Sequence, residues 1–220
     1  MFNKSFFDVN VITIPEDCDV VFVADMFAED YAGGAELTTQ ALIDSSPFTI
    51  FKLHSKDVNQ ALLEQGHRKH WIFGNFSAMD MNLIPTIVAN MSYSILEYDY
   101  KYCRYRSPEK HLSIEKKDCD CHENIYGKMI SALYQGSKSL WWMSEKQMEH
   151  YIAKFPFLEK KVNTVLSSVF DEAFFLKAKL LREKYKNAEK KKWAILGSNS
   201  WIKGVDGAKK WCEDNNHEYE

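Results

Sequence analysis

Short apolar runs alternate with amphipathic segments along most of the chain. The run at 19–27, DVVFVADMF, is almost wholly apolar and has the length of a buried parallel strand. A segment opened by two glycines follows at 33–46, and its pattern predicts a helix. The alternation then repeats. We expect strands over 19–27, 48–55, 70–76, 92–100, 138–144 and 161–170, with helices over 33–46, 58–66, 78–90, 123–137, 148–155 and 174–185.

Strands that alternate with helices require right-handed crossovers and therefore favour a parallel sheet covered by helices. The fold class that we expect is α/β, a Rossmann-like, mostly parallel sheet with helices on both faces, over roughly residues 17–175. Pro85 is expected to kink or break the third helix, and Gly66 to end the second. A long polar connection is expected between Lys101 and Glu123.

The end of the chain has a different pattern. Residues 176–192 carry eight Lys or Arg against two Glu, which suggests a solvated helix end or linker. A new strand at 193–199 and a new helix at 204–215 follow. One such unit cannot bury its own apolar face, so it must either add to the first sheet or open a second domain whose remainder is missing. We therefore expect a first domain over 1–175, a helix or linker over 176–192, and the first strand and helix of a truncated second domain over 193–220.

Composition narrows the class of protein. The 220 residues include 28 Lys and Arg and 31 Asp and Glu, so the net charge of −3 disfavours nucleic acid as a partner. No apolar run is long enough for a transmembrane segment, and Asp8 and Asn10 interrupt the start of the chain before a signal sequence forms. The five cysteines are then expected to be reduced thiols in a cytoplasmic protein.

The turn after the first predicted strand is the first candidate site. Gly33 and Gly34 stand at a predicted helix N-terminus, where free N–H groups and the helix dipole favour an anion such as a phosphate. The pattern is not the dinucleotide fingerprint, and no acidic residue follows the second strand to hold a ribose, so a nicotinamide-dependent oxidoreductase is disfavoured. A tight turn with no ligand is the alternative for the two glycines.

An apolar strand, a loop and the sequence GGAE that opens a long helix resemble the start of GT-B glycosyltransferases of the family-4-like group. The resemblance recurs at residues 197–208, GSNSWIKGVDGA, which keep the Gly, the Lys-Gly pair and the later Ala of the donor-site pattern of that family. Ser198 replaces the Arg of the pattern. The segments at 97–111, 141–158 and 165–170 also resemble glycosyltransferases of phages and environmental microbes.

The resemblance implies the N-terminal, acceptor-side half of a GT-B fold. It implies transfer of a sugar from a nucleotide-sugar donor to a hydroxyl acceptor, as in polysaccharide or glycoconjugate biosynthesis, without a catalytic metal. Gly33 and Gly34 would contact the donor phosphate, while Lys203 and Gly204 would bind the diphosphate. Because most of the donor site would be missing, we expect the 220-residue chain to be inactive alone.

Charged and aromatic residues cluster where the fourth predicted strand ends. Glu97, Asp99 and Lys101 alternate along it, so we expect all three on one face of the strand end. Glu97 and Asp99 are the candidate catalytic carboxylates, for acceptor binding or as a general base. We assign Asp25, Tyr98, Lys101 and Arg104 to acceptor binding. A salt-bridged strand end, neutralised by Lys101, Arg104 and Arg106, and aromatic packing under a loop are the alternatives.

Three cysteines lie in or next to the long connection. Cys103, Cys119 and Cys121, with His122 or His111 as the fourth ligand, would form a tetrahedral zinc site that fixes this segment. Free thiols and a disulfide are the alternatives. A different kind of function also stays open, a non-enzymatic Rossmann-like module that binds a carbohydrate or a protein.

Overall fold

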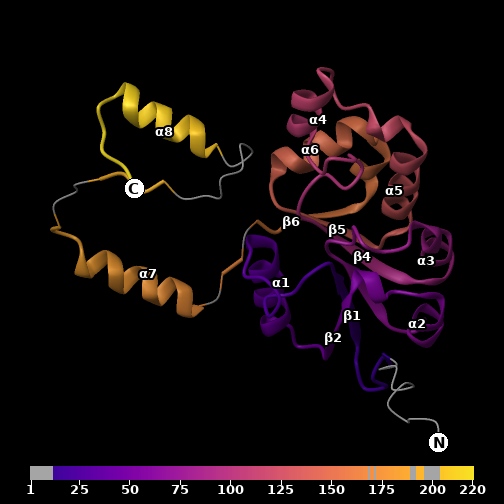
Figure 1. The fold of residues 1–220 in the computed structure, drawn as a ribbon. Helices are drawn as coiled ribbons and strands as arrows, with labels where there is room; N and C mark the ends of the chain where they lie inside the picture. Colours follow the sequence, from indigo (N-terminus) through magenta and orange to yellow (C-terminus); the bar gives the residue numbers. More distant parts are fainter. Residues whose placement is uncertain (1–11, 168, 171, 189–191, 196–203) are drawn as a thin grey trace, which may run out of the picture. The chain divides into compact units, whose positions relative to one another are not determined.

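The chain divides into two compact units, Met1–Phe170 and Asp171–Glu220. The structure, a computed structural model, describes residues 12–167, 169–170, 172–188, 192–195 and 204–220 (Figure 1). The division lies close to the boundary that the sequence predicts at 175.

The first unit is built on a parallel sheet of six strands. These are β1 (Val20–Ala24), β2 (Ile50–His54), β3 (His70–Phe73), β4 (Ser92–Glu97), β5 (Ser139–Trp142) and β6 (Val162–Val165). Every pairing between neighbouring strands is parallel, and the strand order is β2-β1-β3-β4-β5-β6. The predicted Rossmann-like α/β fold is confirmed, and each predicted strand of this unit has its counterpart in the sheet.

Helices cover both faces of the sheet. The α-helices of this unit are α1 (Gly34–Ser45), α2 (Gln60–Gln65), α3 (Ile84–Asn90), α4 (Pro108–Glu115), α5 (Ile125–Gly136) and α6 (Glu145–Lys154), and the 3-10 helices are η2 (Ser55–Asp57), η3 (Met81–Leu83), η4 (Cys121–Glu123) and η5 (Pro156–Lys160). Figure 1 shows α1 on one side of the sheet and α2 and α3 on the other. The larger apolar core joins the sheet to α2, α3, α5 and α6, and a smaller core joins it to α1.

The order of the strands reverses direction at β1. The chain passes from β1 outward to β2 and then returns across β1 to β3, so β1 lies between its two successors. Loops on either side of such a point diverge and leave a crevice at the carboxyl ends of the strands, which is where open parallel sheets bind ligands. The loop after β1 and the loop after β3 therefore border the most favourable place for a site.

Two local predictions are wrong. Pro85 does not kink a helix over 78–90, because η3 precedes it and Pro85 lies in the first turn of α3, where its missing N–H leaves no bond unmade. The connection after Lys101 is not a continuous loop, because it contains α4. Ser107 caps that helix by accepting a hydrogen bond from the Lys110 backbone N–H at 3.1 Å.

The second unit contains α7 (Glu172–Lys184) and α8 (Val205–Asp214). Trp193 forms a parallel β-bridge with Tyr219, so part of the predicted strand at 193–199 pairs with the end of the chain. Lys203 and residues 196–199 lie outside the described residues. Within the part of the chain that is described, no helix is both long and apolar enough to cross a membrane.

Candidate functional site

Asp25 follows β1 directly and is held at the carboxyl end of the sheet. Its carboxylate accepts hydrogen bonds from the Ser55 hydroxyl at 2.5 Å and from the Ser77 hydroxyl and backbone N–H at 2.7 and 3.0 Å. The Ala78 N–H adds another at 3.2 Å. Burial acts to raise the pKa of this carboxyl, but the hydrogen bonds outweigh it and the pKa is lowered. Asp25 is therefore an ionised, fixed acceptor that ties three loops together.

Gly33 and Gly34 begin α1, at the end of the loop that starts with Asp25. Gly33 is the N-cap and makes no side-chain capping bond, and Gly34 is the first helical residue. A Cβ on Gly33 would collide with the Glu36 carboxylate and lie 2.6 Å from the Tyr31 ring, so these two side chains would have to move. A Cβ on Gly34 would meet no atom within 4 Å. The first turn of α1 thus combines a tight approach at Gly33 with open space at Gly34.

Asp99 and Arg106 form an ion pair past the end of β4. The Arg106 Nε donates to the Asp99 carboxylate at 2.8 Å, and its Nη2 donates to the Asn75 side chain at 2.9 Å. Nη1 is buried and has no hydrogen-bond partner among the described residues. Burial opposes the charge of the guanidinium, but Asp99 outweighs it and raises the pKa of Arg106.

The loop after β3 joins these groups into one polar rim. Asn75 contacts Arg106, and Ser77, two residues later, contacts Asp25. Arg106 has a left-handed backbone with φ of 58°, a conformation that is costly for a residue with a side chain. Strain of this kind persists where the surroundings hold the residue in place, which here is the double contact to Asp99 and Asn75.

Glu97 is buried, and among the described residues its carboxylate is hydrogen-bonded to Lys101 and Tyr134 and not to the rim residues. It forms an ion pair of 3.1 Å with Lys101, and both side chains are fully buried. Tyr134 donates a hydrogen bond to the Glu97 carboxylate, and the Lys101 ammonium also donates to the Leu96 carbonyl at 3.1 Å. Burial raises the pKa of Glu97 and lowers that of Lys101. The predicted alternation of 97, 99 and 101 on one strand face is wrong, because β4 ends at Glu97 and the chain turns.

The other predicted contacts are spread out. The half-buried Tyr98 pairs its hydroxyl with Thr39 of α1 at 2.5 Å, and the exposed Arg104 pairs with Glu115 of α4. Gly204 is the N-cap of α8 in the second unit, with φ of 71°. Of the residues predicted for the site, the structure brings Asp25, Gly33 and Gly34 to the loop after β1 and Asp99 to the loop after β4.

A second cluster lies within the connection between β4 and α5. Cys103, His111, Cys119 and Cys121 are all buried, and their ligand atoms lie within 4.8 Å of one another. This cluster can hold a metal ion. Of the two histidines that the sequence offers as the fourth ligand, His111 is the member of the cluster and His122 is not. Burial raises the pKa of the Cys119 thiol to about 12.

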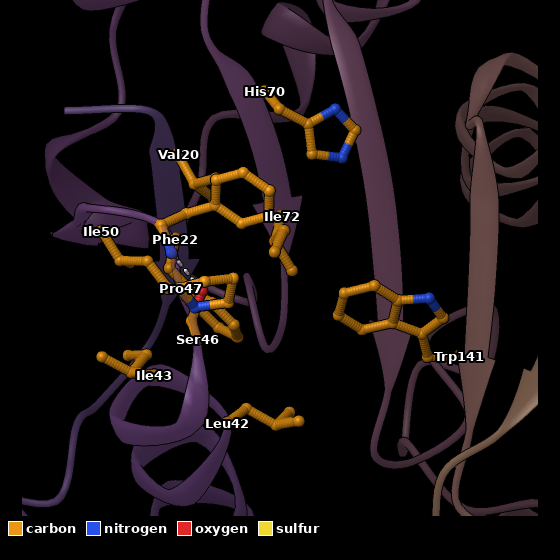
Figure 2. A pocket seen from close by; sticks show the side chains of 11 residues that line it. Val20, Phe22, Leu42, Ile43, Ser46, Pro47, Ile50, His70, Ile72 and Trp141 are labelled. Atoms are coloured by element: carbon orange, nitrogen blue, oxygen red, sulfur yellow. Dashed lines mark hydrogen bonds between the residues drawn. The ribbon is translucent and has the colours of Figure 1, made fainter.

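An apolar cavity of about 330 Å³ lies on the face of the sheet that α1 covers. Figure 2 shows Leu42 and Ile43 of α1 on one side and Trp141 of β5 on the other. Val20, Ile50 and His70, which are the first residues of their strands, also line it. The cavity therefore reaches the amino ends of the strands and is distinct from the rim at their carboxyl ends.

Sequence reasoning missed three partners in the rim. Ser55 and Asn75 lie at the ends of predicted strands and Ser77 lies directly after one, but none belongs to a motif, and Arg106 was considered only as a neutralising charge. Polar residues at the ends of the second and third predicted strands were the available signal, since the carboxyl ends of parallel strands meet at one edge. Comparison of the chain with protein-family models and with curated proteins finds no match.

Proposed function

We propose that this chain is the acceptor-side part of a glycosyltransferase that moves a sugar from a nucleotide-sugar donor to a hydroxyl acceptor. The observation that carries the proposal is the polar rim at the reversal of strand order, where Asp25, Asp99 and Arg106 meet the loops after β1, β3 and β4. The GGAE sequence at the start of α1 supports the same reaction. In this proposal the rim binds the acceptor and α1 faces the donor phosphate.

The N-terminus of α1 would contact the donor diphosphate. Its first N–H groups are free of a side-chain cap, and the open space at Gly34 lets a phosphate oxygen approach the backbone. In the second unit, Gly204 opens α8 in a left-handed conformation with no atom near its missing Cβ. From the resemblance, a phosphate is the class of ligand expected at Lys203 and Gly204.

Asp99 is the proposed acceptor base. Its side chain is about a third exposed, whereas Glu97 has no exposed surface and contacts no solvent. The ion pair with Arg106 fixes the orientation of the Asp99 carboxylate, and the second carboxylate oxygen is left for an acceptor hydroxyl. Asp25 would position the acceptor through the loop that it anchors.

The proposed step balances without a cofactor. The acceptor oxygen bonds to the anomeric carbon, the bond from that carbon to the diphosphate oxygen breaks, and the nucleoside diphosphate leaves with the electron pair. The acceptor proton passes to Asp99. Helix N-termini and cationic side chains stabilise the charge that develops on the diphosphate. A metal bound by the cysteine–histidine cluster would have a structural part in this proposal.

The apolar cavity beside α1 favours a second candidate function, a binding module for a carbohydrate or protein. Its walls are mostly aliphatic and aromatic side chains, which stack on or cover an apolar surface. In this case no chemistry would take place at the rim, and the carboxylates would only position loops.

Sugar transfer is tested with the product of the complete gene and a panel of nucleotide sugars and hydroxyl acceptors. We expect acceptor-dependent release of nucleoside diphosphate, and we expect Asp99→Asn to lower kcat by about 10²–10⁴-fold, as the loss of a general base does. The matched control is Asp44→Asn, an exposed carboxylate on α1, which should leave kcat unchanged. Absence of transfer with every donor, together with carbohydrate or protein binding, would favour the second candidate.

A further inference from the structure

We propose that Cys103, His111, Cys119 and Cys121 bind one structural Zn²⁺ ion, with His111 coordinating through Nδ1. The four residues come from three local structures. Cys103 lies in the turn after β4, His111 lies in α4, and the other two cysteines lie at the start of η4 or just before it. The proposal concerns a site separate from the polar rim.

The distances fit a tetrahedron before any ion is added. A zinc ion with Zn–S bonds of ~2.3 Å and a Zn–N bond of ~2.0 Å separates sulfur from nitrogen by about 3.5 Å and sulfur from sulfur by about 3.8 Å. The Cys121 Sγ lies 3.4 Å and the Cys103 Sγ lies 3.9 Å from His111 Nδ1. All four ligand atoms lie within 4.8 Å of one another. The widest of these separations exceeds the tetrahedral sulfur–sulfur separation by no more than about 1 Å, so small side-chain movements would close the site.

The chemistry of the ligands selects zinc. Three thiolates and one imidazole form a soft, tetrahedral donor set that suits Zn²⁺, whereas Mg²⁺ and Ca²⁺ require oxygen ligands. All four residues are buried, so the site is closed in the way of structural zinc sites. A disulfide between two of the cysteines would explain only that pair. It would not explain why the third thiol and the imidazole converge on the same place.

A carboxylate lies near the second ring nitrogen of His111. Its Nε2 is buried without a hydrogen-bond partner among the described residues, and the Asp120 carboxylate lies 3.9 Å away. Metal-bound histidines usually donate their other N–H to a carboxylate or carbonyl, which fixes the ring. Coordination through Nδ1 leaves the proton on Nε2, and a small movement brings Asp120 into contact.

The ion would release three thiol protons to solvent and leave a net charge of −1 at the site. Lys154 of α6 lies beside it, because its ammonium donates to the Cys119 carbonyl at 3.2 Å.

Helix α5 packs closely against the segment that carries Cys121. A Cβ on Gly127 of α5 would collide with the Cys121 carbonyl and lie 2.6 Å from the His122 Cα, so the two backbones are in direct contact.

Zinc would fix the segment that carries Arg106. The Cys103 backbone accepts a hydrogen bond from the Arg106 N–H at 2.8 Å and donates one to the Tyr100 carbonyl at 2.9 Å. Arg106 in turn contacts Asp99. An ion that fixes Cys103 therefore also fixes the turn that ends at Arg106, the residue with the left-handed backbone. In this way the ion would position Arg106 in the rim.

The test starts with the full 220-residue chain, purified without a metal-affinity tag and dialysed against buffer free of metal. We expect elemental analysis to find one zinc per chain. Replacement of the zinc by Co²⁺ should give the visible absorption of a tetrahedral cobalt site with thiolate ligands. A chain that folds without stoichiometric metal and takes up no Co²⁺ would overturn the proposal.

Variants identify the ligands. His111→Asn should weaken zinc binding and change the cobalt spectrum, while His122→Asn, the matched control, should leave both unchanged. Asp120→Asn should weaken binding by about 10–100-fold, as loss of an outer partner does. Equal effects of the two histidine variants would contradict the assignment.

Thiol alkylation of the unaltered chain provides a readout that does not depend on folding of a variant. Cys103, Cys119 and Cys121 should resist alkylation until a chelator is added and then react together. Cys18 and Cys212, which are also buried, should not respond to the chelator. A disulfide among the three cysteines, found by mass spectrometry of the unreduced chain, would overturn the proposal.

Discussion

Four hydrogen bonds converge on the carboxylate of Asp25 and lower its pKa. Three of these bonds come from Ser77 and Ala78, after β3, and one comes from Ser55, after β2. A single side chain therefore fixes the loops that border the crevice, and its charge matters for stability as well as for ligands.

Asp25→Asn should lower the free energy of unfolding at pH 7 by about 1–3 kcal/mol, because the amide accepts fewer of these hydrogen bonds. A carboxyl whose pKa is lowered by folding stabilises the fold above its unfolded pKa of about 3.9 and loses that effect as the pH falls through its folded pKa. The difference from the unaltered chain in urea unfolding should therefore shrink below about pH 4. A difference that is independent of pH would contradict this account, and Asp44→Asn is the exposed control.

The buried ion pair of Glu97 and Lys101 gives a second prediction at this scale. Lys101→Met should destabilise the fold by about 3–5 kcal/mol, because it leaves the Glu97 carboxylate buried without its cation. Arg104→Met removes an exposed partner of Glu115 and should cost far less, because water already screens that ion pair. Urea unfolding of both variants makes the comparison. Equal losses would show that Lys101 is not held as a buried charge.

At the scale of elements, the strands and most helices could be predicted, because apolar runs and amphipathic periods depend on burial that the sequence records directly. Helix α4 was missed although Ser107 and Pro108 begin it with a capping serine and a proline. The segment has few apolar residues, so it shows no amphipathic period that would predict a helix. The alternation expected from Glu97 to Lys101 failed because a strand period holds only while the strand continues, and β4 ends at Glu97.

The contact between α5 and η4 yields a prediction about these elements. Gly127→Ala places a Cβ against the Cys121 carbonyl, so it should destabilise the fold by about 1–3 kcal/mol. The matched control is Gly34→Ala, where the added Cβ meets no atom within 4 Å and stability should not fall. Thermal unfolding of both variants measures the difference. A Gly127→Ala variant as stable as the unaltered chain would show that η4 can move away from α5.

At the scale of the whole molecule, the parallel sheet decides which distant residues meet. Asp25, Asn75 and Asp99 are far apart in sequence but each follows a strand, so the fold gathers them at one edge. The sequence could predict that gathering in outline. It could not predict that Arg106 joins Asp99 to Asn75, or that His111 rather than His122 completes the cysteine cluster, because both depend on how one connection folds over the sheet.

The most direct measurement of the central claim is an NMR titration of the ¹⁵N-labelled 220-residue chain with nucleoside diphosphates and nucleotide sugars. If the start of α1 holds a donor diphosphate, the amide signals of Gly33, Gly34 and Ala35 should shift in a saturable way. A nucleoside without phosphate should leave these signals unchanged. The N-terminus of α6, which Ser144 caps, is the internal control, and its amide signals should not shift with any of the ligands. Saturable binding that shifts other residues and leaves Gly33 and Gly34 unchanged, or no binding by any of these ligands, would contradict the account.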